Sequence, residues 1–430
     1  MSKAREFPYW LLAATLLAYL NALGASFQFD DFNVIVDNPA VHSLAAWWDG
    51  MPGIRPLLKL SYTLNWLADP GPIGFHAVNL ALHGINVALV WRLTGHFPAP
   101  AGGDVRTVRL VTTVLFALHP IQTESVTYVS GRSMSLMAAF GLAGLLAWLE
   151  APERRHPRAW HGGALLLFAA AILSKEVAVV LPVALLLFSR RAWLPALLAG
   201  LALLALFLGF GYARLLAEPM PRDLASNLIS ELNAVYYLIG QVFQPHRLNI
   251  DPLLPELEGW RPASLAQAGG LAGLLVIAAL KRVAWPWLGF ALGWFILLLL
   301  PTHSLIPRLD LASERHFYLA ALGLYWLAGI AAGAWLNRAG LRALLVALTL
   351  AGMAGTHLRN RDYQDEISLW RQTTVLSPGH ARAWNNLGWA YLLAERHGEA
   401  RVAFARALEA DPDHVQARRN LDYLDQKVTP

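Results

Sequence analysis

The chain alternates between long apolar stretches and short polar breaks along most of its length. The first apolar stretch, Pro8 to Ser26, is long enough as a helix to cross a hydrocarbon layer of about 30 Å. Together the stretches predict an all-α, polytopic membrane protein with about eleven spanning helices. The others are Phe75–Leu93, Val108–Leu118, Met134–Leu149, Ala164–Leu173, Val177–Phe188, Trp193–Tyr212, Leu265–Leu280, Trp285–Leu300, His316–Leu336 and Leu344–His357.

Basic residues in the polar breaks predict the orientation. Lys3 and Arg5 precede the first stretch, so by the positive-inside rule we expect the N-terminus in the cytoplasm and an uncleaved signal anchor after it. Every break expected on the inner side carries at least two Lys or Arg, as Arg190 and Arg191 do. An odd number of spans places the C-terminus on the same, periplasm-like side as Asp30 and Asp31.

Composition agrees with a membrane protein, because 56% of the residues are hydrophobic and only 15% are charged, against roughly 25% charged in soluble domains. The chain has no cysteine, which excludes disulfides and thiolate chemistry. Residues 27–72 form a large first outer loop, in which Ile54–Leu67 is amphipathic and suited to the interface. The short apolar segment Leu232–Phe243 is either interfacial or re-entrant.

The C-terminal part, residues 359–430, is polar and contains no spanning stretch, so the membrane domain is expected to comprise residues 1–358. Within it, residues 381–414 fit the 34-residue tetratricopeptide pattern at eight positions. Two uses are open for this module, a groove that docks a protein or peptide and a structural cap on the membrane domain. The matching positions are Trp384, Leu387, Gly388, Tyr391, Ala400, Phe404, Ala407 and Pro412.

Acids and bases are expected to meet at the outer edge of the membrane. Asp30 and Asp31 follow the first span directly, where they can stay ionised and still face a lipid-borne substrate. Basic residues on this side are exceptions to the positive-inside rule and suit an anionic head group with an apolar tail. These are Arg55, Lys59, Arg132, Lys175, Arg247, Arg308 and Arg315, with Glu124, Glu176 and Glu314 among them.

Three short segments of this outer side carry the candidate residues. A helix beginning at Thr123 would bring Glu124, Tyr128 and Arg132 to one face. The alternatives for such residues are phosphate clamps or ordinary ion pairs and snorkelling side chains. The Lys175–Glu176 pair interrupts two apolar stretches, and Glu314-Arg315 has the same character.

Histidines do not predict a metal centre. His76 and His83 lie on one span, seven residues apart and without a third ligand nearby, so packing or hydrogen bonding is the expected role. No nucleotide-binding or serine-hydrolase motif is present, and nothing suggests a nucleic-acid partner.

The ordered set of these segments resembles the transmembrane-and-tetratricopeptide (TMTC) O-mannosyltransferases of the GT-C class of membrane glycosyltransferases. The resemblance covers nearly the whole chain, and its most specific part runs from His119-Pro120 to Gly131-Arg132. The other segments that carry it are Phe29-Asp30-Asp31, Asp37-Asn38, Arg55-Pro56-Leu57, His76 to Asn79, Ser174-Lys175-Glu176 and Glu314-Arg315.

The resemblance implies a donor in which a sugar is linked to a polyprenyl phosphate, and a Ser or Thr hydroxyl of a protein as acceptor, with inversion. It implies Asp30 as the base, with Asp31 as the alternative base or as the group that orients Asp30, and Glu124 as a positioning acid. Arg132, Lys175, Arg315 and Arg55 are expected at the donor phosphate, supported by Glu176, Glu314, His76 and His119. No cofactor is required, although a divalent metal between carboxylates is possible.

The composition is typical of a bacterial protein, so the resemblance implies the inner membrane and undecaprenyl phosphate as carrier. The active site and the tetratricopeptide module are then periplasmic, where the module can dock the acceptor. Two alternatives belong to other classes: a transporter or flippase for a lipid-linked substrate, and a membrane-anchored scaffold. A flippase would place its charges at mid-membrane, and a scaffold leaves the outer acids and bases without a role.

Overall fold

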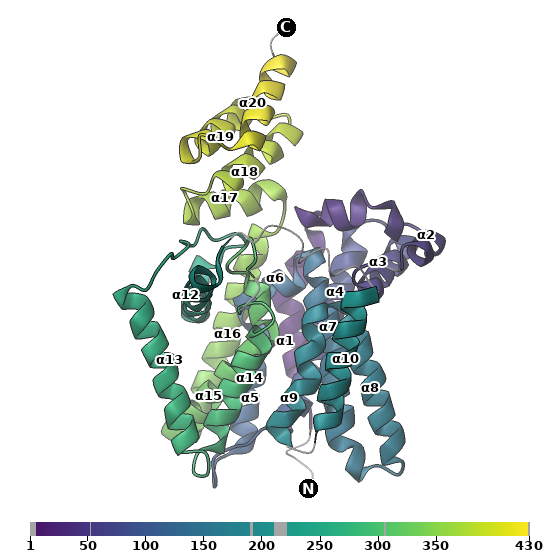
Figure 1. The fold of residues 1–430 in the computed structure, drawn as a ribbon, viewed down its shortest axis with the longest axis vertical. Helices are drawn as coiled ribbons and strands as arrows, with labels where there is room; N and C mark the ends of the chain where they lie inside the picture. The colour runs from purple at the N-terminus through teal and green to yellow at the C-terminus, as the bar shows by residue number, and fades with distance from the viewer. Residues whose placement is uncertain (1–5, 52, 190–191, 210–221, 305–306, 429–430) are drawn as a thin grey trace.

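The fold is helical throughout the described part of the chain, which contains no β-strand. The computed structural model describes residues 6–51, 53–189, 192–209, 222–304 and 307–428. Lys3, Arg5, Arg190 and Arg191, and the end of the apolar stretch at Tyr212, therefore lie outside the described residues. Figure 1 shows a bundle of upright helices with a smaller stack of helices above it.

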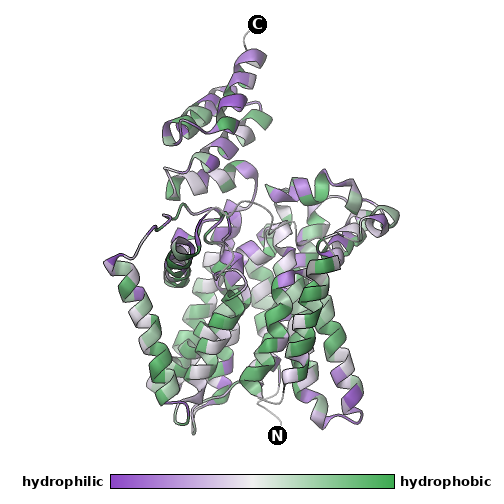
Figure 2. Ribbon diagram, viewed as in Figure 1, coloured by the Kyte–Doolittle hydropathy of each residue, from purple (hydrophilic) through white to green (hydrophobic). Residues whose placement is uncertain are grey.

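Each apolar stretch coincides with a helix, and these helices form the upright bundle in Figure 1. Apolar residues dominate this bundle, whereas the stack above it is mixed and largely hydrophilic (Figure 2). Proline opens several of the helices, because at the first helical position its missing N–H is not needed. The bundle helices are α1 (Tyr9–Tyr19), α4 (Pro72–Leu93), α5 (Val105–Leu118), α7 (Arg132–Glu150), α8 (Pro157–Ser174), α9 (Val180–Phe188), α10 (Trp193–Gly209), α13 (Pro262–Leu280), α14 (Pro286–Leu299), α15 (Phe317–Trp335) and α16 (Arg338–Asp362).

Fewer of the described helices than the expected eleven or so are long enough to span a membrane by length and composition. In the described residues, five helical segments are long and apolar enough to cross a membrane. Four further apolar helical segments are shorter, at 10–17 residues. Polar residues limit the length of such a segment, as Ser174-Lys175 does before Glu176–Phe188. The five are Pro72–His96, Val129–Glu153, Pro262–Leu280, Glu314–Trp335 and Arg338–Asp362.

Two helices lie across the bundle instead of along it. The predicted interfacial helix is α3 (Pro56–Ala68), which follows the short α2 (Leu44–Asp49) in the first outer loop. The segment predicted as interfacial or re-entrant is part of α12 (Leu224–Phe243), and Figure 1 shows it nearly end-on, across the upright helices. This orientation supports the interfacial alternative.

The centre of the bundle is packed around α5 and α15. Gly329 of α15 lies so close to α5 that a Cβ at this position would stand 2.7 Å from the carbonyl oxygen of Val108. An aromatic core lies beside this contact. The ring of Phe97 is at its centre, with centroid distances of 5.3 Å to Trp294 and 5.2 Å to Trp326. This packing joins the first turns of α5 to the second half of α15, at the opposite end of these helices from the candidate residues.

The upper stack contains the tetratricopeptide module. It consists of α17 (Glu366–Leu376), α18 (Ala381–Leu393), α19 (His397–Ala410) and α20 (Val415–Val428). Gly388 lets α18 and α19 approach, because a Cβ there would lie 2.6 Å from the ring of Phe404. The expected boundary between residues 358 and 359 falls inside α16, which continues to Asp362. Its last turn stays helical because Arg359 and Asn360 find buried partners in the membrane domain.

The module is packed firmly on the outer face of the membrane domain. Arg382 of α18 forms ion pairs with Asp251 at 2.5 Å and with Asp310 at 2.6 Å. Gln372 donates to the carbonyl of Leu248 at 2.6 Å. The structural-cap alternative is therefore supported for this face, while another face retains a groove of about 610 Å³ between α17, α18 and α19.

Candidate functional site

The segment Phe29-Asp30-Asp31 is held from three sides at the upper end of the bundle. Phe29 has a left-handed backbone, φ 48°, which is unusual for an aromatic residue. Its N–H donates to the carboxylate of Glu366 at 2.6 Å, and its ring lies edge-on to Trp370 at 5.0 Å. Both partners belong to α17, so the C-terminal module fixes the residue that precedes Asp30.

The two aspartates have opposite environments. Asp31 is 1% exposed, and its carboxylate accepts hydrogen bonds from Ser130 N at 2.8 Å, Ser130 Oγ at 2.5 Å and Gln28 N at 3.1 Å. Burial raises the pKa of Asp31 to about 7, although these hydrogen bonds oppose the increase. A carboxylate so enclosed cannot reach a substrate, and of the two alternatives for Asp31 the geometry favours orienting Asp30.

Asp30 is half-buried, and its carboxylate has no hydrogen bond or ion pair within the described residues. Its backbone N–H donates to the hydroxyl of Tyr128 at 3.0 Å. Asp30 also interacts electrostatically with the guanidinium of Arg315. It is therefore an accessible carboxylate with a fixed backbone beside a cation, which is what a base at this position requires.

Glu124 is buried and holds the Arg315 segment in place. Its carboxylate accepts from Ser313 Oγ at 2.7 Å and from Arg315 N at 2.9 Å, and it lies 3.3 Å from Arg315 Nε. With the Glu124 side chain 2% exposed and that of Arg315 24% exposed, the arginine is the member of this pair that substrate can reach. Glu124 therefore holds Arg315 in place, while its expected role in catalysis stays a prediction.

The helix expected from Thr123 to Arg132 is broken. It forms only α6 (Thr123–Val126), followed by a tight turn, and α7 begins at Arg132. The turn depends on Gly131, where a Cβ would lie 2.0 Å from the carbonyl oxygen of Glu124. The expected common face of Glu124, Tyr128 and Arg132 is therefore absent.

Arg132, expected at the donor phosphate, is held by acceptors of the protein itself. The side chain is fully buried. Its guanidinium donates to Asn79 Oδ1 at 2.6 Å, to Asn65 Oδ1 at 2.8 Å and to the carbonyl of Phe75 at 2.9 Å. With its donors bound to protein acceptors, Arg132 ties α3 and α4 to the start of α7.

Four of the outer basic residues form a cationic cluster, defined here as Arg55, Lys175, Arg308 and Arg315. Arg55 is paired with Glu176 through two hydrogen bonds, at 2.7 and 2.9 Å. The expected pairing between Lys175 and Glu176 is replaced by this one. Electrostatic interactions connect Lys175 with the three arginines of the cluster.

Lys175 is the most unusual member of the cationic cluster. It is 3% exposed, and its Nζ donates to Ser133 Oγ at 3.2 Å, with no carboxylate in ion-pair range among the described residues. Burial, together with the charges of Arg55 and Arg315, lowers the pKa of Lys175 well below its usual value. An anion in the cluster would stabilise the charged ammonium.

The supporting residues have structural contacts. Glu314 pairs with the buried Arg359 at 3.3 Å and accepts from Asn249 N at 2.5 Å. His76 contacts the carbonyl of Ala25 at 3.1 Å. His119 contacts the carbonyl of Val242 at 2.9 Å, and burial lowers its pKa to about 4, so the ring is neutral near pH 7.

Two residues of the site were not assigned a role from the sequence. Arg308 is one of the outer basic residues, and that position was the available signal; the structure adds it to the cationic cluster. Tyr128 accepts the hydrogen bond from Asp30, which no sequence pattern indicated. The described part of the chain brings together no three His, Asp or Glu side chains that could hold a metal ion.

The model of the tetratricopeptide repeat family matches residues 381–414, as the pattern predicted. Protein O-mannosyl-transferase Tmtc3 of Drosophila melanogaster is 24% identical over 96% of this chain and 56% of its own length. Mouse protein O-mannosyl-transferase TMTC3 is 23% identical over 96% of this chain and 52% of its own. Drosophila Tmtc2 is 38% identical over 37% of this chain and 19% of its own.

No solved structure matches the chain. The chain spans about half the length of the two curated relatives that it matches almost throughout. These relatives confirm the resemblance found in the sequence: the homologues of this helical, apolar chain with its tetratricopeptide repeat are TMTC-type protein O-mannosyl-transferases.

Proposed function

We propose that this chain is a GT-C membrane glycosyltransferase that moves a sugar from a polyprenyl-phosphate donor to a Ser or Thr hydroxyl of a protein, with inversion. The observation that carries the proposal is the accessible carboxylate of Asp30 beside Arg315 and the cationic cluster. The printed names of the relatives, protein O-mannosyl-transferases, support a glycosyl transfer to protein.

In this mechanism Asp30 removes the proton of the acceptor hydroxyl as the oxygen attacks the sugar carbon. The bond between that carbon and the phosphate oxygen breaks, and the electron pair leaves with the lipid phosphate. Tyr128 and the buried Asp31 fix the position of Asp30. A positioned base contributes typically about 10²–10⁴-fold to the rate.

The cationic cluster takes up the charge that develops on the departing phosphate. Arg315 is oriented by Glu124, and Arg55 by Glu176, so two guanidinium groups are in place before the donor arrives. Fixed charges of this kind stabilise a transition state without reorganisation during the reaction. Lys175 and Arg308 provide positive charge without an ion-pair partner among the described carboxylates, which leaves them for an anionic substrate.

The donor is expected from the membrane side and the acceptor from the aqueous side. Undecaprenyl phosphate in a bacterial inner membrane fits the proposal, with the site and the module in the periplasm. The groove of about 610 Å³ between α17, α18 and α19 is the place for an acceptor segment. A flippase would require charges at mid-membrane, and the cationic cluster lies instead at the ends of helices.

The test of the base is the substitution Asp30→Asn, which keeps the shape and removes the proton acceptor. Sugar transfer from a radiolabelled polyprenyl-phosphate sugar to protein is measured in membranes that contain equal amounts of each variant. We expect a loss of about 10²–10⁴-fold. The matched control is Asp49→Asn, on an exposed residue of α2 in the same loop. Full activity of the Asp30 variant would remove this assignment.

A further inference from the structure

A buried chain of three titratable side chains lies beside the cationic cluster and has no part in the proposed mechanism. Glu231 of α12 lies 2.7 Å from His303 Nδ1, through its Oε2 atom. His303 Nε2 lies 3.1 Å from His316 Nδ1, and the two rings are nearly perpendicular. The side chains of Glu231 and His303 are 3% and 0% exposed.

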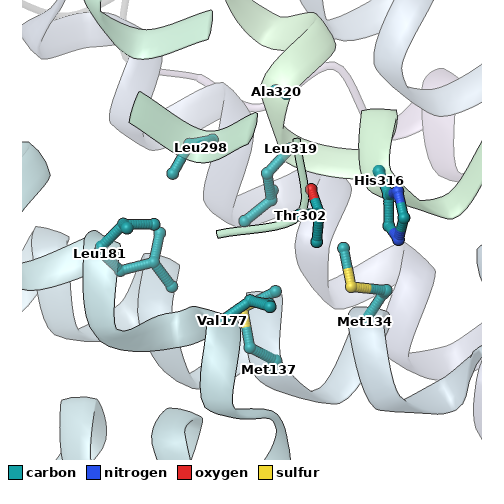
Figure 3. Close-up of a pocket in the computed structure, with 10 residues that line it drawn as sticks. Met134, Met137, Val177, Leu181, Leu298, Thr302, His316, Leu319 and Ala320 are labelled. Carbon is teal, nitrogen blue, oxygen red and sulfur yellow. The ribbon is translucent and has the colours of Figure 1, made fainter. Parts of the chain in front are cut away.

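The end of this chain, His316, lines a small cavity. Figure 3 shows its ring near Thr302, with apolar side chains on the other walls, among them Met134 and Leu319. The cavity is about 20 Å³, enough for one water molecule. His316 Nε2 has no hydrogen bond to any residue that the structure describes. This atom can therefore bind a water molecule or a ligand in the cavity.

The direction of the hydrogen bonds follows from the chemistry of the groups. An ionised carboxylate only accepts, so His303 donates from Nδ1 to Glu231. If both rings are neutral, His303 accepts at Nε2, His316 donates from Nδ1, and His316 Nε2 carries a lone pair. One proton added at His316 Nε2 makes this atom an N–H donor, and the second bond reverses only if the Nδ1 proton of His316 then moves to His303 Nε2.

The added proton also changes the charge balance of the interior. Without it, Glu231 is a buried carboxylate whose only ion-pair partner among the described residues is a neutral ring, a costly arrangement. With it, the three-residue chain is neutral overall. Burial opposes an added proton at His316, and so do His303 and the positive charges of Arg308, Arg315 and Lys175. An anion bound among those three cations offsets their part of the opposition and so favours proton uptake.

We propose that the Glu231–His303–His316 chain is a proton reservoir for the anion site: when a phosphate group occupies the cationic cluster, the chain takes up one proton. The proton comes from solvent and resides on His316 Nε2, which then donates toward the phosphate or a water beside it. This inference rests on the proposed donor site, whose phosphate would be the anion.

Proton uptake is measured by titration calorimetry of the full chain in detergent, in buffers of different ionisation enthalpy near pH 7. The probes are farnesyl phosphate, inorganic phosphate and the neutral alcohol farnesol. Lys175 contributes its own proton uptake, so the readout is the difference between wild type and variant. We expect His316→Asn and Glu231→Gln each to lose about one proton of uptake, while binding persists.

The matched control is His246→Asn, on an exposed histidine of the loop after α12, which should keep the wild-type uptake. Thermal unfolding of each variant shows that the fold is retained, and the Glu231 variant tests the same chain if the His316 variant unfolds. Uptake with either phosphate probe, lost in both variants, supports the reservoir. The ratio of the affinities for farnesyl phosphate and inorganic phosphate shows how much the lipid chain adds to binding.

Two results overturn the reservoir in different ways. Binding of farnesyl phosphate with equal proton uptake in wild type and in both variants removes the role of His316 and Glu231 and leaves the proposed transferase intact. Failure of the wild type to bind either phosphate probe better than farnesol removes the anion site itself, and with it the proposed donor.

Discussion

The charged residues at the two ends of the bundle are arranged in different ways. At the inner end, Glu150 accepts from Arg92 at 2.5 Å and from Arg154 at 2.6 Å, and these arginine side chains are 57% and 36% exposed. At the outer end, Arg132 and Lys175 are buried, and Lys175 has no carboxylate in ion-pair range among the described residues. Exposed pairs contribute little to stability, whereas desolvated cations need a structural or a functional partner.

The largest expected effect separates a structural cation of the outer end from a functional one. Replacing Arg132 with Met leaves the buried oxygens of Asn65, Asn79 and Phe75 without a donor. We expect a loss of about 3–5 kcal/mol in the free energy of unfolding, measured by denaturation in detergent. A variant as stable as the wild type would place Arg132 among the functional cations after all.

A second test uses the pH dependence of Asp31. Its pKa of about 7 in the folded chain lies above the usual 3.8, so the folded state binds its proton more tightly. This contribution is complete below pH 3.8 and is lost as the pH rises through 7. Between pH 5 and 6 we expect stability to fall by about 1.4 kcal/mol per pH unit from this group, with the slope decreasing to about half at pH 7.

The comparison variant for this test is Asp31→Asn, which cannot ionise. Unfolding free energies of both proteins are measured between pH 5 and 8, and the difference between the two should carry the slope. Parallel curves for wild type and variant would show that Asp31 does not titrate in this range.

The third test concerns Lys175, whose replacement should weaken donor binding without lowering the free energy of unfolding. Lys175→Met removes a desolvated amine and keeps the volume of the side chain, so the free energy of unfolding should not fall. The KM for the polyprenyl-phosphate donor should rise about tenfold, the loss of one charge-assisted contact of about 1.4 kcal/mol. An unchanged KM together with lower stability would make Lys175 a structural residue.

The smallest effect is expected at the inner end. Arg92→Gln removes an exposed partner of Glu150, which keeps Arg154. We expect a change below about 1 kcal/mol in stability and unchanged transfer activity in membranes. A large loss of activity in this variant would show that the inner end takes part in the reaction.

The sequence predicted the helices well because spanning segments must be apolar along their whole length. It also predicted that Asp30, Glu124 and Arg315 would share one end of the bundle, since alternating polar breaks assign each loop to a side. The burial of Arg132 was not predicted, for a local reason. The turn at Gly131 rotates the start of α7 inward, and a pattern of spacing cannot show which neighbour of a turn becomes buried.

Contacts between distant segments were beyond the sequence. The pairing of Arg55 with Glu176, instead of Lys175 with Glu176, joins residues 121 positions apart. The Glu231–His303–His316 chain likewise connects α12 with the segment between α14 and α15, and no motif marks it. Such partners are fixed by packing, so only the folded chain identifies them.

The hydrogen bond from Phe29 N to Glu366 attaches the residue that precedes Asp30 to α17. The full repeat, α18 and α19, follows α17 in the chain, and α20 lies beyond the repeat. Repeats added beyond α20 would lengthen the helical array without moving Asp30. Under the proposed function, the surface that binds the acceptor can therefore change at one end of the array while the Asp30 site stays fixed at the other.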